Sequence, residues 1–250
     1  MSNQTLTFEK VGQIGVVTLN RSEANNAINM ELAGAMADVC SEINQDQEIR
    51  VAIITGAGES FSAGTDWGSH AEEMALWSVA TPVDKLNCPV IAAINGDTLG
   101  QGLELALVCD LRIAVGTARL GLPEIASGLI PHDGGTQRLP RLIGRARALE
   151  MILLGESISA VEALQLGLVN KVVPPPELSS TVDAIAQRIA ASAPIALRYS
   201  KEAIMKGSEL TMEQGLRLES DLYAILQTTG DRTEGITSFL EKRPPEFKGT

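Results

Sequence analysis

Short apolar runs bounded by turn residues constrain the fold of this 250-residue chain more than any other feature. Each run is too short for a buried helix and has the length of a buried strand. Helical patterning separates the runs, first over residues 30–43 and again over residues 103–108. This alternation predicts an α/β fold with a largely parallel sheet. The predicted strands are residues 13–19, 51–55, 90–94 and 110–114.

From about residue 137 the pattern becomes helical, and only residues 171–173 have the character of a strand. We therefore divide the chain into a core over residues 1–190 and a helical region over residues 191–250. The predicted helices of this second half are residues 145–154, 160–166, 176–191, 193–206, 211–227 and 233–241.

The charge balance excludes several kinds of partner. Asp and Glu outnumber Lys and Arg by 31 to 20, which gives a net charge of −11. A field of this sign repels nucleic acid and anionic membranes, so we expect neither as a partner. An anionic ligand needs backbone amides or a local basic patch.

The chain carries no visible targeting signal. Its first ten residues, MSNQTLTFEK, contain neither an apolar nor an Arg-rich segment, and no apolar run reaches the length of a membrane span. The cysteines Cys40, Cys88 and Cys109 lie in apolar runs without a CxxC pair, which indicates buried thiols of a reducing compartment. A cytoplasmic location is therefore expected, and no Cys/His cluster suggests a metal site.

Two glycine turns follow two of the predicted strands. The first is Ser62-Ala63-Gly64-Thr65-Asp66, and the second is Gly100-Gln101-Gly102, which begins a helix. Glycine lets a backbone turn tightly and approach a ligand closely, and a helix N-terminus presents unpaired N–H groups. The two turns could direct two amides at one oxygen. They could equally be ordinary strand-to-helix connections.

Two glutamates occupy apolar surroundings near these turns. Glu104 lies in the first turn of the helix LELALV, and Glu124 follows Gly121-Leu122-Pro123. Taken singly, each is a capping or surface residue as readily as a functional one. As a pair beside two glycine turns they are candidates for acid/base catalysis, because an apolar setting is costly for an unpaired carboxylate.

Several linked motifs, in order, resemble the enoyl-CoA hydratase/isomerase (crotonase) family from about residue 5 to the C-terminus. They include AIITGAGESFSAGTD, PVIAAINGDTLGQGLELALVCDLRIA and GLPEIASGLIPHDGGTQRLPRLIG. The resemblance implies a crotonase-type spiral of ββα repeats over residues 1–190, which holds the CoA and acyl site. It also implies that residues 191–250 form a C-terminal helical trimerisation layer, so a homotrimer or a dimer of trimers is expected.

By this resemblance, the backbone amides of Thr65 and Gln101 form an oxyanion hole for the thioester carbonyl. Glu124 resembles the residue that protonates the α-carbon, and Glu104 resembles its partner, which holds and deprotonates water. Coenzyme A is part of the substrate, so no separate cofactor is expected. The implied substrate-binding residues are Arg21, Ala24, Ala63, Gly64, Asp66, Trp67, Gly100, His132 and Lys242.

Three departures from the family pattern bear on the acyl group. Gln101 stands where relatives usually have glycine, His132-Asp133 replaces a small pair, and the segment from Trp67 to Asn87 is short. They favour a cyclic or oxygen-bearing acyl group, with an ordinary short-chain substrate as the alternative. His132 is either near the site or an ordinary loop histidine, with Asp133 capping a helix near Gly134.

The expected reaction is hydration of a 2-enoyl-CoA. The alternatives are an enoyl-CoA double-bond isomerase or an acyl-CoA hydrolase of the same fold. The presence of both glutamates favours hydration, because isomerases of the family often keep only the later carboxylate.

Overall fold

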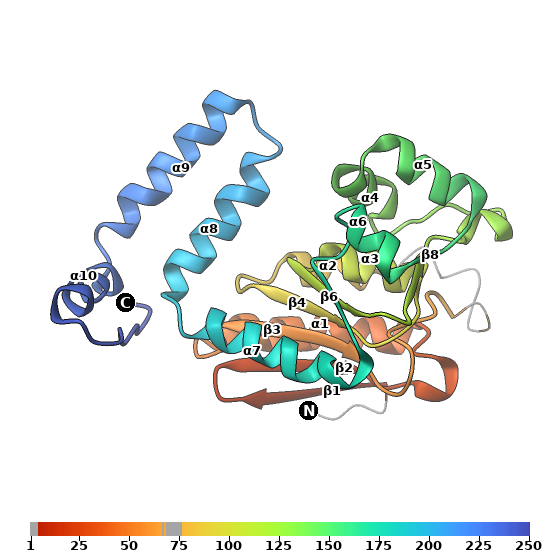
Figure 1. The fold of residues 1–250 in the computed structure, drawn as a ribbon, viewed down its shortest axis with the longest axis horizontal. Coiled ribbons are helices and arrows are strands. Elements are labelled where there is room, and N and C mark those ends of the chain that lie inside the picture. The colour runs from red at the N-terminus through yellow and green to blue at the C-terminus, as the bar shows by residue number, and fades with distance from the viewer. Residues whose placement is uncertain (1–4, 67, 69–76) are drawn as a thin grey trace.

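A mostly parallel six-stranded sheet forms the centre of the computed structural model, which describes residues 5–66, 68 and 77–250 (Figure 1). Its strand order is β1-β2-β3-β4-β6-β9, and only the β1–β2 pair is antiparallel. The predicted parallel α/β architecture is therefore confirmed. The strands are β1 (Leu6–Val11), β2 (Ile14–Leu19), β3 (Val51–Gly56), β4 (Val90–Ile94), β6 (Leu111–Val115) and β9 (Lys171–Val173).

A second, three-stranded sheet lies where the functional turns were predicted. It consists of β5 (Thr98–Leu99), β7 (Arg119–Gly121) and β8 (Ile158–Ser159). Strand β5 ends immediately before Gly100, and β7 ends three residues before Glu124. An isolated bridge between Ser62 and Thr98 joins the first glycine turn to β5. Both turns and Glu124 are thus positioned by this small sheet.

Helices cover the sheet and enclose α3 (Gln101–Val108). Helix α1 (Met30–Gln45) buries its apolar residues from Leu32 to Ile43, whereas Met30, where the apolar spacing began, is exposed. The Asn29 side chain caps α1 by accepting from the Leu32 amide (2.9 Å). Helix α3 is buried at every position and packs against two other helices. The remaining elements of the core are η1 (Ser22–Ala24), α2 (Ala80–Asp84), η3 (Glu124–Ser127), α4 (Gly135–Ile143), α5 (Arg145–Leu154), α6 (Ala160–Gln165), η4 (Pro175–Glu177) and α7 (Leu178–Ala190).

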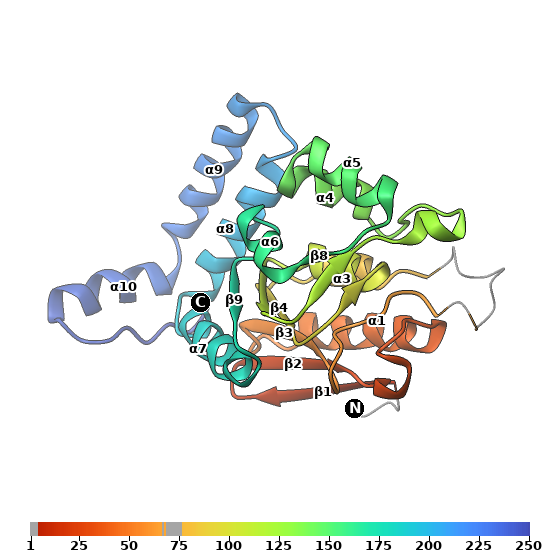
Figure 2. The same cartoon turned by 45° about the vertical axis from the view of Figure 1, so that its right-hand side comes forward.

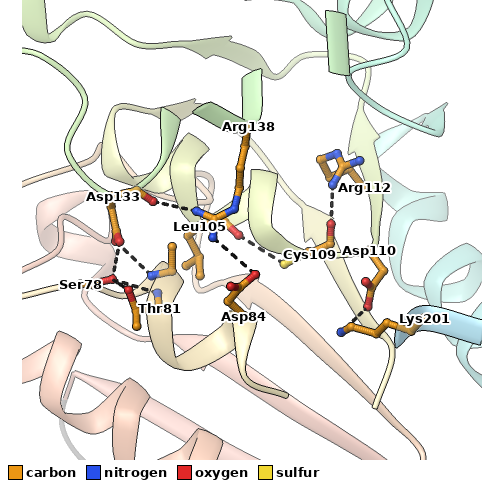
Figure 3. Close-up of polar contacts among 11 residues, drawn as sticks. Ser78, Thr81, Asp84, Leu105, Cys109, Asp110, Arg112, Asp133, Arg138 and Lys201 are labelled. Atoms are coloured by element: carbon orange, nitrogen blue, oxygen red, sulfur yellow. Dashed lines mark hydrogen bonds and ion pairs between the residues drawn. The ribbon is translucent and has the colours of Figure 1, made fainter. Parts of the chain in front are cut away.

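A buried arginine fixes the C-terminal end of α3. The side chain of Arg112 is 5% exposed and donates to the carbonyl oxygens of Leu168, Ala106 and Cys109. Figure 3 shows the bond to Cys109. A cation at this position satisfies carbonyls that the helix leaves unpaired and complements the helix dipole. Helix α3 therefore has a fixed base for the residues of its first turn.

The last three helices project from the core (Figure 1). They are α8 (Pro194–Gly207), α9 (Met212–Leu226) and α10 (Gly230–Glu241). Helix α8 buries none of its residues, and α9 buries only Leu222. Lys201 ties α8 to the sheet through an ion pair with Asp110 (2.8 Å), which Figure 3 also shows. Within the described part of the chain, no helix is long and apolar enough to cross a membrane.

The cysteines are free thiols, as expected from their spacing. Cys40 and Cys109 are buried, and Cys88 is half-buried. Burial raises the pKa of Cys40 and of Cys109 to about 12, so neither thiol ionises near neutral pH.

Candidate active site

The two glycine turns are in contact, and Gly64 and Gly100 each have a backbone conformation that other residues rarely adopt. Gly64 has φ +91° and Gly100 has φ +51°. A Cβ atom on Gly64 would lie 2.8 Å from the carbonyl oxygen of Leu99 and 3.3 Å from the Cα of Gly100. Glycine at position 64 is therefore required by both backbone conformation and space. The close approach brings the amides of the two following residues, Thr65 and Gln101, to one place.

Among the described residues, neither of these amides has a hydrogen-bond acceptor. Ile28 pairs with the residues on either side of Thr65: its amide donates to Gly64 (2.7 Å), and its carbonyl accepts from Asp66 (2.8 Å). Gln101 is the first residue of α3, where a helix leaves its amides without intrahelical acceptors, and Gly100 offers no side-chain cap. Neither amide has an acceptor among the hydrogen bonds of residues 5–66, 68 and 77–250. The arrangement is suited to binding a developing oxyanion.

Glu104 extends from the first turn of α3 and is 0% exposed. Its Oε1 accepts from the amides of Asp133 (2.8 Å) and Gly135 (2.7 Å), whereas its Oε2 is buried without a partner in the described structure. A Cβ on Gly135 would lie 2.9 Å from Oε1, so glycine is needed there for the approach. Burial raises the pKa of Glu104, and the two amides oppose this effect.

Glu124 begins η3 and is 5% exposed. Its carboxylate lies against the second glycine turn, because a Cβ on Gly100 would be 3.0 Å from Glu124 Oε1. Its Oε2 is also buried without a partner among the described residues. Burial, with a smaller contribution from the charge of Glu104, raises the pKa of Glu124 to about 7. The structure thus brings together both predicted glutamates and both predicted oxyanion amides.

The polar residues that depart from the family pattern bind one another. Thr65 Oγ1 donates to Gln101 Oε1 (3.3 Å), and Gln101 Nε2 donates to Asp133 Oδ2 (3.2 Å). The same Asp133 oxygen accepts from the amides of Val79 (2.9 Å) and Ala80 (3.0 Å) at the start of α2. Gln101 and Asp133 are therefore not free to bind a polar acyl group.

The prediction that Asp133 caps the helix near Gly134 is wrong. Helix α4 begins at Gly135 after the N-cap residue Gly134, which has φ +108°, and no side chain caps it. Asp133 instead caps α2, a helix distant in sequence that the apolar pattern did not reveal. Figure 3 shows the Asp133 carboxylate directed at Ser78 and the start of α2.

A pocket of about 280 Å³ lies beside this network. It is lined by residues of α2, of the segment that directly precedes α2, and of the segment 132–138. His132 is exposed and contributes to the lining, and its charge lowers the pKa of Glu104 slightly. Neither glutamate lines the pocket. The predicted substrate-binding residue Trp67 lies outside the described residues. The pocket is lined by Trp77, Ser78, Thr81, His132, Asp133, Gly134 and Arg138.

Arg21, predicted to bind CoA, supports the first glycine turn. Its guanidinium donates to Asp66 Oδ2 (2.9 Å) and to the carbonyl oxygen of Ala27. Ala24, in the same loop, is half-buried, and the residue after it, Asn25, accepts from the amide of Ala63 (2.9 Å). The loop and the turn that carries Thr65 are therefore one connected unit.

Lys242 is not brought to this site by its own chain. It is exposed and ends α10 in a left-handed conformation. Figures 1 and 2 both place α10 on the opposite side of the chain from α3 and α4. Any role of Lys242 at an active site would have to involve another copy of the chain.

Two supporting residues were missed in the sequence. Asn26 is fully buried, and its Nδ2 donates to the carbonyls of Ala57 and Ser60. Ser62 Oγ donates to the Asn26 carbonyl (2.8 Å) and accepts from the Gly64 amide (3.1 Å). Their side chains hold the first glycine turn in place. The consecutive asparagines Asn25 and Asn26, both left-handed, were the available signal, since asparagine tolerates this conformation.

Comparison with known proteins gives a consistent result. The family model described as enoyl-CoA hydratase/isomerase matches residues 9–250. The chain is 41% identical to a short-chain-enoyl-CoA hydratase of Clostridium acetobutylicum, over 98% of both chains. It is also 41% identical to an (E)-benzylidenesuccinyl-CoA hydratase of Thauera aromatica, over 98% of this chain and 99% of that one. A crystal structure of an enoyl-CoA hydratase from Bacillus anthracis superposes with a TM-score of 0.95 at 42% identity, covering 99% of this chain and 100% of the other.

Proposed function

The chain belongs to the enoyl-CoA hydratase/isomerase family, and from that premise we propose that Glu104 and Glu124 add water to an enoyl-CoA whose thioester carbonyl binds the Thr65 and Gln101 amides. Full-length relatives named enoyl-CoA hydratases give the reaction class, that of a hydro-lyase. The crotonase-type fold predicted from the sequence is confirmed by the close structural match. The observation that carries the assignment of residues is the contact of the Glu124 carboxylate with the second glycine turn, beside a buried Glu104 whose charge raises the pKa of Glu124.

In the proposed reaction, the two amides stabilise negative charge on the carbonyl oxygen as an enolate forms. The oxygen of water bonds to Cβ while one of its protons passes to Glu104. Glu124 gives its proton to Cα, which quenches the enolate. Coenzyme A enters as part of the substrate. The two glutamates end the step with their protonation states exchanged, so a proton must return to Glu124 before the next turnover.

The electrostatics support these different roles. Hydration needs Glu124 protonated and Glu104 ionised at the same time. The pKa of Glu124 is raised to about 7 by burial and by Glu104, so a substantial fraction is protonated near neutral pH. Two amides stabilise the ionised form of Glu104 against the effect of its burial. The surroundings therefore favour the required asymmetry.

Product analysis tests the reaction class directly. Incubation with crotonyl-CoA should give a 3-hydroxyacyl-CoA whose mass exceeds that of the substrate by one water. A product of unchanged mass would instead indicate the isomerase, and release of free coenzyme A would indicate the hydrolase. Either of these as the main product, at a rate exceeding hydration, would overturn the proposed function.

The acyl group is a further proposal: we expect a cyclic or oxygen-bearing acyl group to be preferred over a simple straight chain. The name of the Thauera aromatica relative supports a bulky group, and that of the Clostridium acetobutylicum relative supports the short-chain alternative. Gln101 and Asp133 no longer support this proposal, since they pair with each other. The indole Nε1 of Trp77 does, because it is buried without a partner in the described structure and belongs to a pocket-lining residue.

We expect kcat/KM for the best cyclic or carboxylated enoyl-CoA to exceed that for crotonyl-CoA by about 10-fold or more, the scale of the net free energy of one hydrogen bond. The measurement is a panel of initial rates with acyl-CoA thioesters of matched size. Turnover of crotonyl-CoA near the diffusion limit, with no turnover of the cyclic or carboxylated compounds, would leave only the short-chain alternative.

We also propose that the chain assembles as a homotrimer or a dimer of trimers through its C-terminal helices. These helices expose apolar side chains that their own chain leaves uncovered, and Phe239 is 81% exposed. Such a surface is typical of a subunit interface. The other large examples are Ile204, Met212, Tyr223 and Leu240.

Light scattering at micromolar concentration should report a mass of three or six chains. Replacing Phe239 and Leu240 by aspartate should lower this mass, because charge on a buried interface is costly. The same change at Leu153 and Leu154, which are also exposed but lie in α5, is the matched control. A stable wild-type monomer would contradict the proposal.

Coenzyme A binding should depend on local positive charge despite the acidic chain. We expect Lys242→Glu to weaken binding of coenzyme A several-fold. The effect should be larger at low salt, because Lys242 is exposed and salt screens the attraction between an exposed charge and an anionic ligand. Arg21→Glu should also weaken binding, but it breaks the Arg21–Asp66 ion pair as well.

The double variant Arg21→Glu/Asp66→Arg separates these two effects, since it restores an ion pair with reversed polarity. Calorimetric titration with coenzyme A at two salt concentrations measures the result. Unchanged affinity in Lys242→Glu and in Arg21→Glu would remove both residues from the binding site.

A further inference from the structure

Asp133 joins three parts of the molecule that the proposed reaction uses. Its carboxylate is 6% exposed and binds the start of α2 and the Gln101 side chain, while its amide binds Glu104. We propose that Asp133 is a positioning residue for hydration: it holds Glu104, the Thr65–Gln101 amide pair and helix α2, which lines the neighbouring pocket, in fixed positions relative to one another. This inference rests on the proposed function and adds a residue to it.

The first link runs through the main chain. The Asp133 amide donates to Glu104 Oε1 at 2.8 Å, beside the Gly135 amide at 2.7 Å. These two bonds fix one oxygen of Glu104, and Oε2 has no partner in the part of the chain that the structure describes. The position of the loop from 133 to 135 therefore sets the direction of the free oxygen that would face water.

The second link runs through side chains to the oxyanion amides. Asp133 Oδ2 accepts from Gln101 Nε2 (3.2 Å), and Gln101 Oε1 accepts from Thr65 Oγ1 (3.3 Å). All three side chains are buried. Since the Thr65 and Gln101 amides come from different glycine turns, this chain of hydrogen bonds is a direct side-chain connection between them.

The third link holds α2, which forms one wall of the pocket. Ser78 Oγ donates to Asp133 Oδ1, and the amides of Val79 and Ala80 donate to Oδ2. Arg138 joins the other end of α2 to the same loop: it donates to the Asp133 carbonyl (3.1 Å) and pairs with Asp84 (3.4 Å), as Figure 3 shows. Both ends of α2 are thus tied to the loop that orients Glu104.

The number of donors around the carboxylate supports a positioning role. Four donors bind the carboxylate in the structure: the amides of Val79 and Ala80 and the Gln101 side chain bind Oδ2, and the Ser78 hydroxyl binds Oδ1. Asp133 is therefore held in place by four neighbours, as a positioning residue requires.

Two substitutions separate positioning from chemistry. Asp133→Asn keeps an oxygen for the three N–H donors, and its new NH2 group can donate to Ser78 Oγ, so kcat should stay within about 3-fold of wild type. Asp133→Ala removes the acceptor of three buried N–H donors, those of Val79, Ala80 and Gln101, and frees the loop. Its kcat should fall by about 100-fold, the scale of a misplacement near 1 Å, with unchanged affinity for coenzyme A.

Asp110→Asn and Asp110→Ala are matched controls. Asp110 also accepts from a backbone amide, that of Val90 (2.7 Å), and from one side chain, Lys201. Asp110 lies beside Val90, the first residue of β4. This end of β4 is the one remote from the glycine turn that follows the strand. Both Asp110 variants should keep kcat within about 3-fold of wild type, whatever their Tm.

Rates of hydration, Tm and Kd for coenzyme A are measured on the full-length assembled protein. Loss of activity in Asp133→Asn equal to that in Asp133→Ala, or a kcat near wild type in Asp133→Ala, overturns the inference. If Asp133→Ala does not fold, Gln101→Met carries the test: a fall in kcat of about 10-fold supports the inference, and an unchanged kcat overturns it. A wild-type protein that hydrates no enoyl-CoA would instead refute the proposed function itself.

Discussion

Glutamine in place of Glu124 is expected to lower kcat for hydration by about 100-fold or more, the scale of lost general acid/base catalysis. Glutamine keeps the shape of the side chain but cannot supply a proton to Cα. Glu104→Gln should cause a loss of similar size, because the amide cannot accept a proton from water. Both side chains are buried, so water from bulk solvent should not replace the lost proton transfer of either variant.

The pH dependence of kcat/KM is a second test of the roles of the two glutamates. Glu124 must be protonated for hydration, and its pKa is raised to about 7, so kcat/KM should fall as the pH rises above about 7. On the acid side the rate should fall as Glu104 becomes protonated. The fall above pH 7 should be absent from the residual activity of Glu124→Gln. A folded variant of either glutamate with near wild-type kcat would remove that residue from the mechanism.

Alanine in place of Gly64 is expected to abolish most activity, by about 100-fold or more, because it would push the two glycine turns apart. The added Cβ would meet the carbonyl oxygen of Leu99 at 2.8 Å, and the φ of +91° is unfavourable for alanine. Separation of the turns moves the Thr65 amide away from the Gln101 amide, so one oxygen can no longer contact both.

Gly167→Ala is the matched control, because Gly167 has a similar φ of +76° but nothing within 4 Å of the added Cβ. Both variants carry the backbone strain, and only Gly64→Ala carries the steric conflict. We therefore expect a comparable loss of Tm from strain in both variants, but loss of kcat only in Gly64→Ala. Equal and small losses of kcat in the two variants would show that the contact between the turns is not required.

The sequence predicted five of the six strands of the central sheet, β2, β3, β4, β6 and β9, because they are largely apolar runs, as buried parallel strands are. It missed β1, the antiparallel edge strand, whose sequence LTFEKV mixes polar and apolar residues. It did not predict β5, β7 or β8, which have two or three residues each and no periodicity to detect. It also missed α2, a five-residue helix with a capping residue, Asp133, that lies about 50 positions later. Short elements held by distant side chains leave no local pattern in the sequence.

The candidate site was predictable only in part, for a similar reason. Glycines beside strand ends and glutamates in apolar settings are local features, and the structure brings them together. The surroundings of Arg21 depend on Asp66, 45 residues away, and those of Gln101 depend on Asp133, 32 residues away. No spacing rule links such pairs, so a side chain predicted to meet substrate instead supports the backbone of the site.

The exchange of an α-proton separates the two glutamates most directly. Butyryl-CoA has no double bond, so it cannot be hydrated, but its Cα–H can be removed and returned while its carbonyl binds the two amides. In D2O, NMR should show stereospecific deuterium incorporation at Cα with wild type and with Glu104→Gln. It should show none with Glu124→Gln. Exchange that persists in Glu124→Gln and disappears in Glu104→Gln would contradict the roles assigned to the two residues.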